Sequence, residues 1–335
     1  MRIMNGEQAI YAQAASNTIE ISVRGRWVSA PALRVNGQVI AIEGTWIKIA
    51  HLHNEDEAES EVADPEACIR ALKEQGSSPR TDIFCFSQLV PDTSPRYKYP
   101  MEMQSIAVAY VADCEKWLAN ISRKTRHAIR RSKRLGVVIR MRSFDAETIQ
   151  GIRDVQNETP VRQGRPYWHY GKTLEQVRQD HCSFAGRSDF MCAYCGGEFI
   201  GFVKLVYCGG FASILQMISK MAHYDKCVSN ALIAKAVERC AEKHIPYLTY
   251  GLFNYGNKGD SSLCRFKVRN GFTEMLVPRY YVPLTAWGRI CVKTRLYRSW
   301  HDMLPHKFIA AASTLRAKWH ARRGWQRVPA PLPEK

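Results

Sequence analysis

Several features that would assign a sequence to a class at once are missing from this one. No run of about 20 apolar residues is present, so a membrane-spanning helix is not expected. The first residues, Met1–Glu7, have no apolar core and do not resemble a secretory signal, which favours a cytoplasmic protein. A Walker loop, a dinucleotide-binding fingerprint and a Ser-His-Asp order are also missing, and Gly256–Ser261 lacks the lysine before the hydroxyl that ends a P-loop.

Cysteine is present without a framework spacing. Eleven cysteines, an odd number, are scattered along the chain, which is typical of reduced thiols in a cytosolic protein. Cys192 and Cys195 form a C-x-x-C pair, but a zinc site needs a second pair, and alternation along a strand would send these two side chains to opposite faces. His51 and His53 beside Glu55–Glu57 are explained more simply by a solvated acidic loop. We therefore expect no metal site.

Acidic residues are few beside basic ones. With 48 Lys and Arg against 31 Asp and Glu, the formal net charge is +17 at pH 7. This excess suggests an anionic partner such as a nucleotide, CoA, tRNA, a polyanionic sugar or a membrane surface, although a merely soluble basic protein would show the same balance. The 335 residues and the hydrophobic content of 46% fit a globular chain of about two domains.

Two segments carry much of the positive charge. Arg123–Arg142 contains nine Lys or Arg and no acid, in a stretch expected to be helical from Asp113 to Leu135, and fits either a solvated helix face or a phosphate-binding surface. Residues 286–327 contain ten Lys or Arg against the single Asp302, with tryptophans interspersed. This segment fits a peripheral contact with the inner face of an anionic membrane, or equally helices packed across a domain boundary.

The stretch from Phe190 to Phe272 has the pattern of one α/β unit. Short apolar runs separated by Gly196–Gly197 and Gly209–Gly210 predict three adjacent antiparallel strands. A helix capped by Ser229 and Asn230 follows; its apolar face is formed by Leu232, Ile233, Ala236, Val237 and Cys240. A fourth strand is expected over 247–250, a helix beginning at 260–262, and a last strand over 273–284.

This β-β-β-α-β-α-β order, with a helix that opens just past the third strand, resembles the GNAT N-acyltransferase fold, whose helix N-terminus holds the pyrophosphate of acyl-CoA. Within it, Ser262–Phe272 resembles the Phe-Lys-x-x-Phe-Gly stretch of the Fem family, aminoacyl transferases with paired GNAT-like domains that build peptidoglycan cross-bridges. Asn270 stands where that pattern has its second Phe. The upstream stretch from Arg126 to Val137 is similar to one in the same family.

The fold class expected is therefore mixed α/β, a GNAT-like acyltransferase fold with a mostly antiparallel central sheet over 106–285. Residues 1–105 form a smaller α/β domain, with strands at Thr18–Val23 and Asp82–Phe86 and a helix beginning near Asp64. The paired-domain Fem architecture implies that this region is a reduced GNAT-like half. Residues 286–335 form a basic helical extension.

Three groups of candidate site residues follow. Arginines and aromatics in the 158–172 loop suggest substrate recognition, or a loop pinned by Tyr167 and Trp168; the candidates are Arg162, Arg165, Trp168, His169 and Tyr170. Main chain past the third strand and the start of the following helix would hold the donor; the candidates are Met217, Ile218, Ser219, Lys226, Ser229, Asn230 and Ala231. The resemblance implies a catalytic role for Lys267, otherwise an exposed helix lysine, and leaving-group protonation by Tyr250 or Tyr255.

The sequence thus predicts an N-acyltransferase that acts on an amine of a sugar, peptide or cell-envelope precursor. Acetyl-CoA or another acyl-CoA is one donor. The glycine-rich loop of ordinary CoA-binding members is replaced by residues 220–229, which moves weight toward an aminoacyl-tRNA donor. The alternative is a catalytically inactive GNAT-like module that binds nucleic acid or an anionic membrane through its basic surface.

Overall fold

A computed structural model describes residues 18–23, 26–53, 61–74, 80–162, 165–254 and 261–298. Its strands are β1 (Thr18–Val23), β2 (Arg26–Val35), β3 (Gln38–Glu43), β4 (Ile49–Leu52), β5 (Ile83–Ser87), β6 (Met101–Tyr110), β7 (Val138–Arg142), β8 (Val161–Arg162), β9 (Arg165–Pro166), β10 (Ser188–Cys195), β11 (Glu198–Cys208), β12 (Phe211–Ser219), β13 (Tyr247–Leu252) and β14 (Thr273–Pro283). Its α-helices are α2 (Pro65–Glu74), α3 (Cys114–Asn120), α4 (Arg123–Arg134), α5 (Ala146–Gln156), α6 (Leu174–His181), α7 (Val228–Glu242), α8 (Ser262–Arg269) and α9 (Ala286–Thr294), and its 3-10 helices are η2 (Ala185–Arg187) and η3 (Met221–Lys226).

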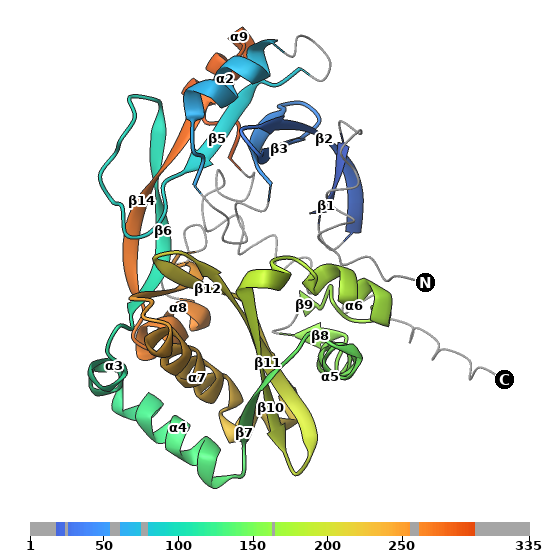
Figure 1. Cartoon of the computed structure of the whole chain (residues 1–335), viewed down its shortest axis with the longest axis vertical. Helices are drawn as coiled ribbons and strands as arrows, with labels where there is room; N and C mark the ends of the chain where they lie inside the picture. Colours follow the sequence, from blue (N-terminus) through green and yellow to red (C-terminus); the bar gives the residue numbers. More distant parts are fainter. Residues whose placement is uncertain are drawn as a thin grey trace, which may run out of the picture.

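One 12-stranded sheet runs through the molecule in the order β1-β2-β3-β4-β5-β14-β6-β13-β12-β11-β10-β7. Its strand pairs are antiparallel except for β12 with β13 and β4 with β5, which are parallel. The mixed α/β class and the mostly antiparallel sheet are therefore confirmed. The long strands β6 and β14 connect the part of the sheet near α7 with the part near α2 (Figure 1).

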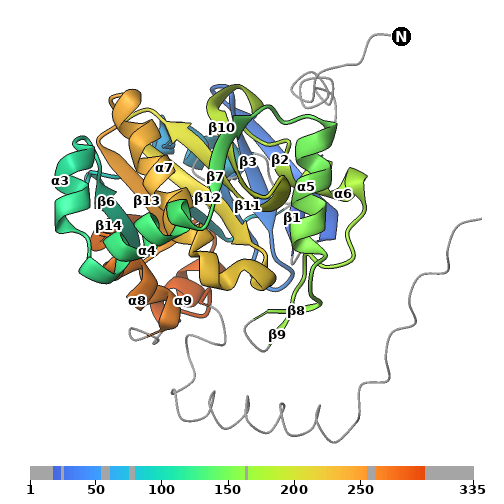
Figure 2. The same cartoon turned by 90° about the horizontal axis from the view of Figure 1, so that it is seen from below.

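Helices cover both faces of the sheet around β10–β12. Alternation along β10 sends Met191 and Ala193 to the core beneath α7, and Phe190 and Cys192 to the core beneath α5. Figure 2 shows α7 and α4 on one side of these strands and α5 and α6 on the other. The predicted apolar face of α7 is buried in the first of these cores.

The N-terminal strands have a core of their own beneath α2. All five residues of β5 are buried, and the Tyr280 ring of β14 is stacked on Phe86 with 5.0 Å between ring centres. The boundary predicted at residue 105 falls within β6, which pairs with both β13 and β14. The division into domains stays a prediction.

Two local expectations were wrong. The helix expected from Asp113 to Leu135 is broken, because Ile121 has an extended backbone (φ −70°, ψ 159°) and the Ser122 side chain accepts a hydrogen bond from the Thr125 N–H and starts α4. Ser229 and Asn230 do not cap α7: its N-cap is Cys227, in the left-handed region at φ 54°, without a side-chain cap.

Residues 299–327 of the basic extension lie outside the described residues.

Candidate functional site

Strands β12 and β13 are paired over only part of their length and then diverge. They pair only where Phe211–Ser213 lies beside Tyr247–Thr249. Beyond this point β12 continues to Ser219 paired with β11, while β13 shifts its register against β6. Among the described strands, none therefore pairs past Ser213 with the side of β12 that is turned away from β11. The donor candidates Met217, Ile218 and Ser219 lie on this stretch.

The start of α7 lies at the end of β12. The Ser219 and Ser229 hydroxyl oxygens are 3.4 Å apart, and the Asn230 Nδ2 donates to the Asn270 Oδ1 at 3.0 Å. Because no side chain in the described part of the chain caps α7, the positive end of its dipole is not neutralised by a cap there. Lys226, which ends η3, adds a half-buried charge beside this turn.

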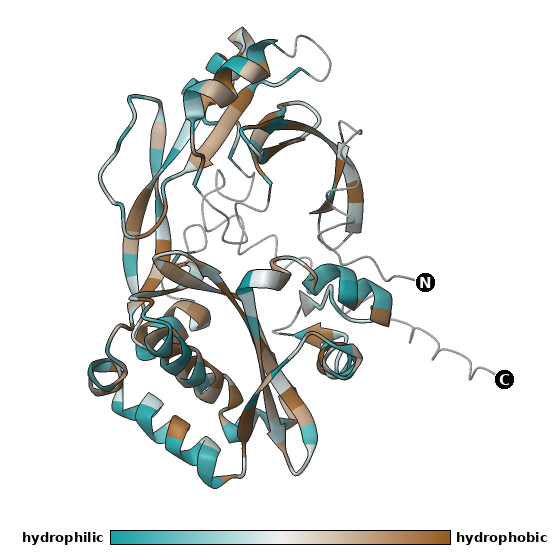
Figure 3. Cartoon of the chain, viewed as in Figure 1, coloured by the Kyte–Doolittle hydropathy of each residue, from teal (hydrophilic) through white to brown (hydrophobic). Residues whose placement is uncertain are grey.

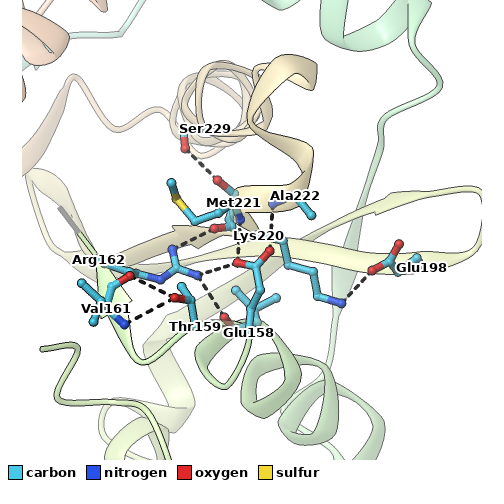
Figure 4. Close-up of polar contacts among 11 residues, drawn as sticks. Glu158, Thr159, Val161, Arg162, Glu198, Lys220, Met221, Ala222 and Ser229 are labelled. Carbon is cyan, nitrogen blue, oxygen red and sulfur yellow. Dashed lines mark hydrogen bonds and ion pairs between the residues drawn. The ribbon is translucent and has the colours of Figure 1, made fainter. Parts of the chain in front are cut away.

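A carboxylate holds the chain between β12 and α7 (Figure 4). The Glu158 Oε2 accepts a hydrogen bond from the Met221 N–H at 2.6 Å, and its Oε1 accepts one from the Ala222 N–H at 2.8 Å. The Arg162 Nη1 donates to the Ser219 carbonyl at 2.9 Å, and its Nη2 donates to Glu158 at 3.2 Å. Glu158 and Arg162 thus fasten the loop after α5 to the end of β12.

Arg162 is therefore bound to protein groups on both of its terminal nitrogens. Its Nη2 also donates to the Val155 carbonyl at 3.0 Å, and its guanidinium lies 5.0 Å from the centre of the Tyr167 ring. Nearby, Lys220 and His223 contact the two oxygens of Glu198 at 2.7 and 3.0 Å. The hydrogen bond from Lys220 is the main reason that the pKa of Glu198 is lowered.

Lys267 is fully buried rather than exposed. Its Nζ donates to the Leu252 carbonyl at 2.5 Å and lies 4.8 Å from the centre of the Tyr250 ring. Burial lowers the pKa of Lys267 to about 8, against a smaller opposing effect of Cys264. The lysine thus lies next to the part of β13 that β12 has left, and Tyr250 lies on that part. Tyr255, the other tyrosine candidate, lies outside the described residues.

The loop between α5 and α6 is divided between buried and exposed side chains. His169 is buried, with its Nε2 3.0 Å from the Gln216 Nε2, and burial lowers its pKa against the opposing effect of Asp180. Trp168 and Tyr170 are exposed. The backbone of Arg165 forms β9, but its side chain lies outside the described part of the chain. The loop is therefore both anchored and able to present aromatic surface.

Helix α4 lies beside η3 and the start of α7 (Figure 2). The Arg131 Nε donates to the Asp225 carbonyl of η3 at 3.1 Å, and Figure 3 shows α4 as mostly hydrophilic, with a single strongly hydrophobic segment. Six exposed cations of α4 form no ion pair with any described carboxylate: Arg123, Lys124, Arg130, Arg131, Lys133 and Arg134. A row of uncompensated positive charge therefore extends away from the start of α7.

The candidate residues are brought together in part. Ser219, Ser229 and Asn230 lie at the start of α7, whereas Tyr250 is on β13 with Lys267 of α8 packed against it.

Sequence reasoning missed Glu158 and Asp180. The spacing of Glu158 and Arg162, four residues apart with opposite charge, was the available signal for the first. Nothing local marked Asp180, whose carboxylate contacts Lys172 and the Trp27 Nε1 of β2.

Within the described residues, no group of three or more His, Cys, Asp or Glu is arranged to hold a metal ion. No helix within the same ranges is both long and apolar enough to cross a bilayer.

Comparison with known proteins shows which solved structures share this fold. No protein-family model matches the sequence, and no curated protein matches it either. Among solved structures, L-PGS from Bacillus licheniformis is similar with a TM-score of 0.53 at 14% identity, covering 80% of this chain and 88% of that one. FemX is similar with a TM-score of 0.52 at 10% identity, covering 83% and 96%. The chain thus has the GNAT-like fold of these proteins, as its motifs implied.

Proposed function

We propose that the protein is an N-acyltransferase whose donor lies in the opening between β12 and β13. The observation that carries this proposal is that β12 separates from β13 after Ser213 and ends, at Ser219, beside the start of α7, which no described side chain caps. A parted strand offers main-chain groups to an acyl carbonyl, and an uncapped helix N-terminus favours phosphate. Both features converge near Ser219 and Ser229, 3.4 Å apart.

The donor carries phosphate, and aminoacyl-tRNA is favoured over acetyl-CoA or another acyl-CoA. Glu158 already occupies the N–H groups of Met221 and Ala222, so the phosphate cradle is confined to the first turn of α7 and Lys226. The 12 residues of α4 span about 18 Å, which exceeds what one pyrophosphate needs but suits successive phosphates of a nucleic acid. The fold shared with L-PGS and FemX, together with the Fem-like stretch Ser262–Phe272, supports acyl transfer as the reaction.

Lys267 and Tyr250 are the proposed catalytic residues. At pH 7 a lysine with a pKa of about 8 is mostly protonated, and its buried charge stabilises an oxyanion more strongly than an exposed charge would. Tyr250, beside it on β13, is the proposed proton donor to the leaving group. Tyr255 remains a candidate for the same step.

The acceptor is proposed to be an amine of a sugar, peptide or cell-envelope precursor. The exposed rings of Trp168 and Tyr170 offer stacking surface, while His169 and Arg162 hold the loop in place from within. Arg165 is kept as a substrate-binding candidate. We propose a cytoplasmic location, because the eleven cysteines are scattered along the chain without the spacing of a disulfide framework.

One observation favours a second candidate function. The unpaired cations of α4 would also serve a catalytically inactive module that binds nucleic acid without transferring anything. Calorimetry distinguishes the two. Titration with acetyl-CoA, with an aminoacyl-tRNA carrying a stable amide linkage, and with uncharged tRNA is expected to show preference for an acylated donor. Equal affinity for any RNA or DNA would favour the inactive module.

A further inference from the structure

Helix α9 is held to the N-terminal part of the sheet in one orientation. The Thr285 hydroxyl accepts a hydrogen bond from the Gly288 N–H at 2.9 Å and donates to the Asp82 Oδ1 at 2.8 Å. A Cβ on Gly288 would lie 2.0 Å from the Asp82 carbonyl oxygen, so the helix and this loop approach as closely as glycine allows. Because Gly288 and Cys291 face inward and are buried, the opposite side of α9 faces outward.

Exposed apolar side chains lie at the surface of α9 and of the segments next to it. Trp287 is 38% exposed and Ile290 is 50% exposed, and they lie one helical turn apart. Trp46, in the turn between β3 and β4, is 88% exposed, and its carbonyl accepts a hydrogen bond from the Trp287 Nε1 at 3.2 Å. Leu296, just past the helix, is 42% exposed. We call these four residues together the α9 face.

Cations border the α9 face. Arg289, Lys293 and Arg295 are exposed, and together with Tyr281 and Tyr297, whose rings are tilted against each other, they line a recess of about 480 Å³. Neither Arg289 nor Lys293 forms an ion pair with a described carboxylate. Two of the described carboxylates close by already have partners: Asp82 is buried and bonded to Thr285, and Glu102, which lines the recess, accepts hydrogen bonds from Tyr297 and Arg298.

We propose that the α9 face docks on an anionic lipid bilayer. Tryptophan rings with a polar edge are suited to the interface between headgroups and acyl chains, and neighbouring Lys and Arg side chains attract anionic headgroups. A protein partner of matching chemistry would need acidic residues around an apolar pocket, whereas a bilayer supplies both the negative surface and the apolar layer at once. The bilayer is the occupant that satisfies the tryptophans and the cations together.

The position of the α9 face separates it from the proposed transfer site. Helix α9 lies at the end of the long axis opposite α4 and α7 (Figure 1). Substitutions on the α9 face therefore leave Lys267, Ser229 and the α4 cations untouched. Membrane docking and donor binding can fail or succeed separately.

The test is co-sedimentation of the full chain with vesicles made of equal parts phosphatidylglycerol and phosphatidylcholine, and with vesicles of phosphatidylcholine alone. The wild type is expected to bind the anionic vesicles and to be released by salt. Trp46→Ser with Ile290→Ser, and separately Arg289→Glu with Lys293→Glu, are expected to lower the partition coefficient about tenfold or more. All four positions are exposed or at the surface of the fold, and circular dichroism confirms that the variants are folded.

Matched controls lie elsewhere on the surface. Leu118→Ser removes an exposed leucine from α3, and Lys116→Glu with Arg178→Glu reverses two exposed charges. Both control variants are expected to sediment like the wild type. The proposal is overturned if the α9 variants also bind like the wild type, if all variants lose binding equally, if neutral vesicles are bound as well as anionic ones, or if the α9 variants lose binding to tRNA instead of binding to vesicles.

Discussion

The Lys267 ammonium lies 4.8 Å from the centre of the Tyr250 ring, beside the stretch of β13 that has no partner in β12. Because the lysine is buried there, its charge meets little competition from water. Lys267→Met is therefore expected to lower kcat by about 10² with a smaller change in KM, as for removal of an oxyanion-stabilising charge. Single-turnover transfer measures this. The control Arg269→Met, on an exposed part of the same helix, should keep its turnover.

The same lysine predicts how stability changes with alkaline pH. Its pKa falls from the ordinary 10.5 to about 8 on folding, so between these values the unfolded chain binds the extra proton. The free energy of unfolding of the wild type should therefore rise with pH over this window relative to Lys267→Met, by about 3 kcal/mol in total. Urea unfolding at pH 7.5 and 10 checks it. Parallel curves for the two proteins would contradict the burial of a charged lysine.

His181 predicts a loss of stability in acid. Burial lowers the pKa of its imidazole to about 3 from an ordinary 6.5, so the folded protein stays unprotonated there while the unfolded chain takes up a proton. Stability should fall below pH 6.5, by about 1.4 kcal/mol per pH unit from this residue. His181→Gln is expected to flatten this dependence between pH 6 and 4, measured by denaturant unfolding. A slope unchanged by the substitution would argue against a buried neutral histidine.

Glu158 and Arg162 should act as a unit. Their ion pair and their hydrogen bonds to Ser219, Met221 and Ala222 depend on each other. Removing either residue therefore leaves the other charged side chain largely buried without its opposite charge. A double-mutant cycle of Glu158→Gln and Arg162→Met is expected to give a coupling energy of about 1–3 kcal/mol in unfolding experiments. Additive effects would mean that the two residues do not hold the end of β12 together.

The α4 cations predict salt-dependent donor binding. Arg130→Glu with Arg134→Glu should weaken tRNA binding and reduce the slope of log K against log salt by about 1 for each phosphate that the variant no longer binds. Binding of acetyl-CoA should change less, since it has fewer phosphates to engage α4. Lys235→Glu on α7, where the lysine is paired with Glu238, is the control and should leave the slope unaltered. A reduced slope in the control as well would indicate a general charge effect.

Much of the fold was predictable because its signals are local. Glycine pairs at 196–197 and 209–210 separate apolar runs of strand length, and β10, β11 and β12 lie where those runs predict them. The break between α3 and α4 was missed because Ser122 functions as a cap only in the observed geometry. The N-cap residue of α7 was predicted wrongly because Cys227 has a left-handed backbone conformation, which cannot be inferred from its residue type.

The site was less predictable because its contacts are between distant segments. Lys267 looked like a surface residue of a capped helix, and only the packing of α8 against β13 makes it buried. The contact of Glu158 with Met221 and Ala222 joins residues more than 60 positions apart, which no spacing rule encodes. Pattern predicts elements and their faces, whereas the partner of a buried charge is decided by tertiary structure.

Acyl transfer itself is the most direct test of the proposed function. The protein is incubated with aminoacyl-tRNA or acetyl-CoA labelled in the acyl group, together with glucosamine and with a lysine-containing peptide, and acid-stable labelled product is measured over time. The account predicts that wild type moves label from at least one donor to an amine, and that Lys267→Met does so about 10² more slowly while Arg269→Met matches the wild type. Label that leaves neither donor faster than without protein, combined with equally tight binding of charged and uncharged tRNA, would contradict it.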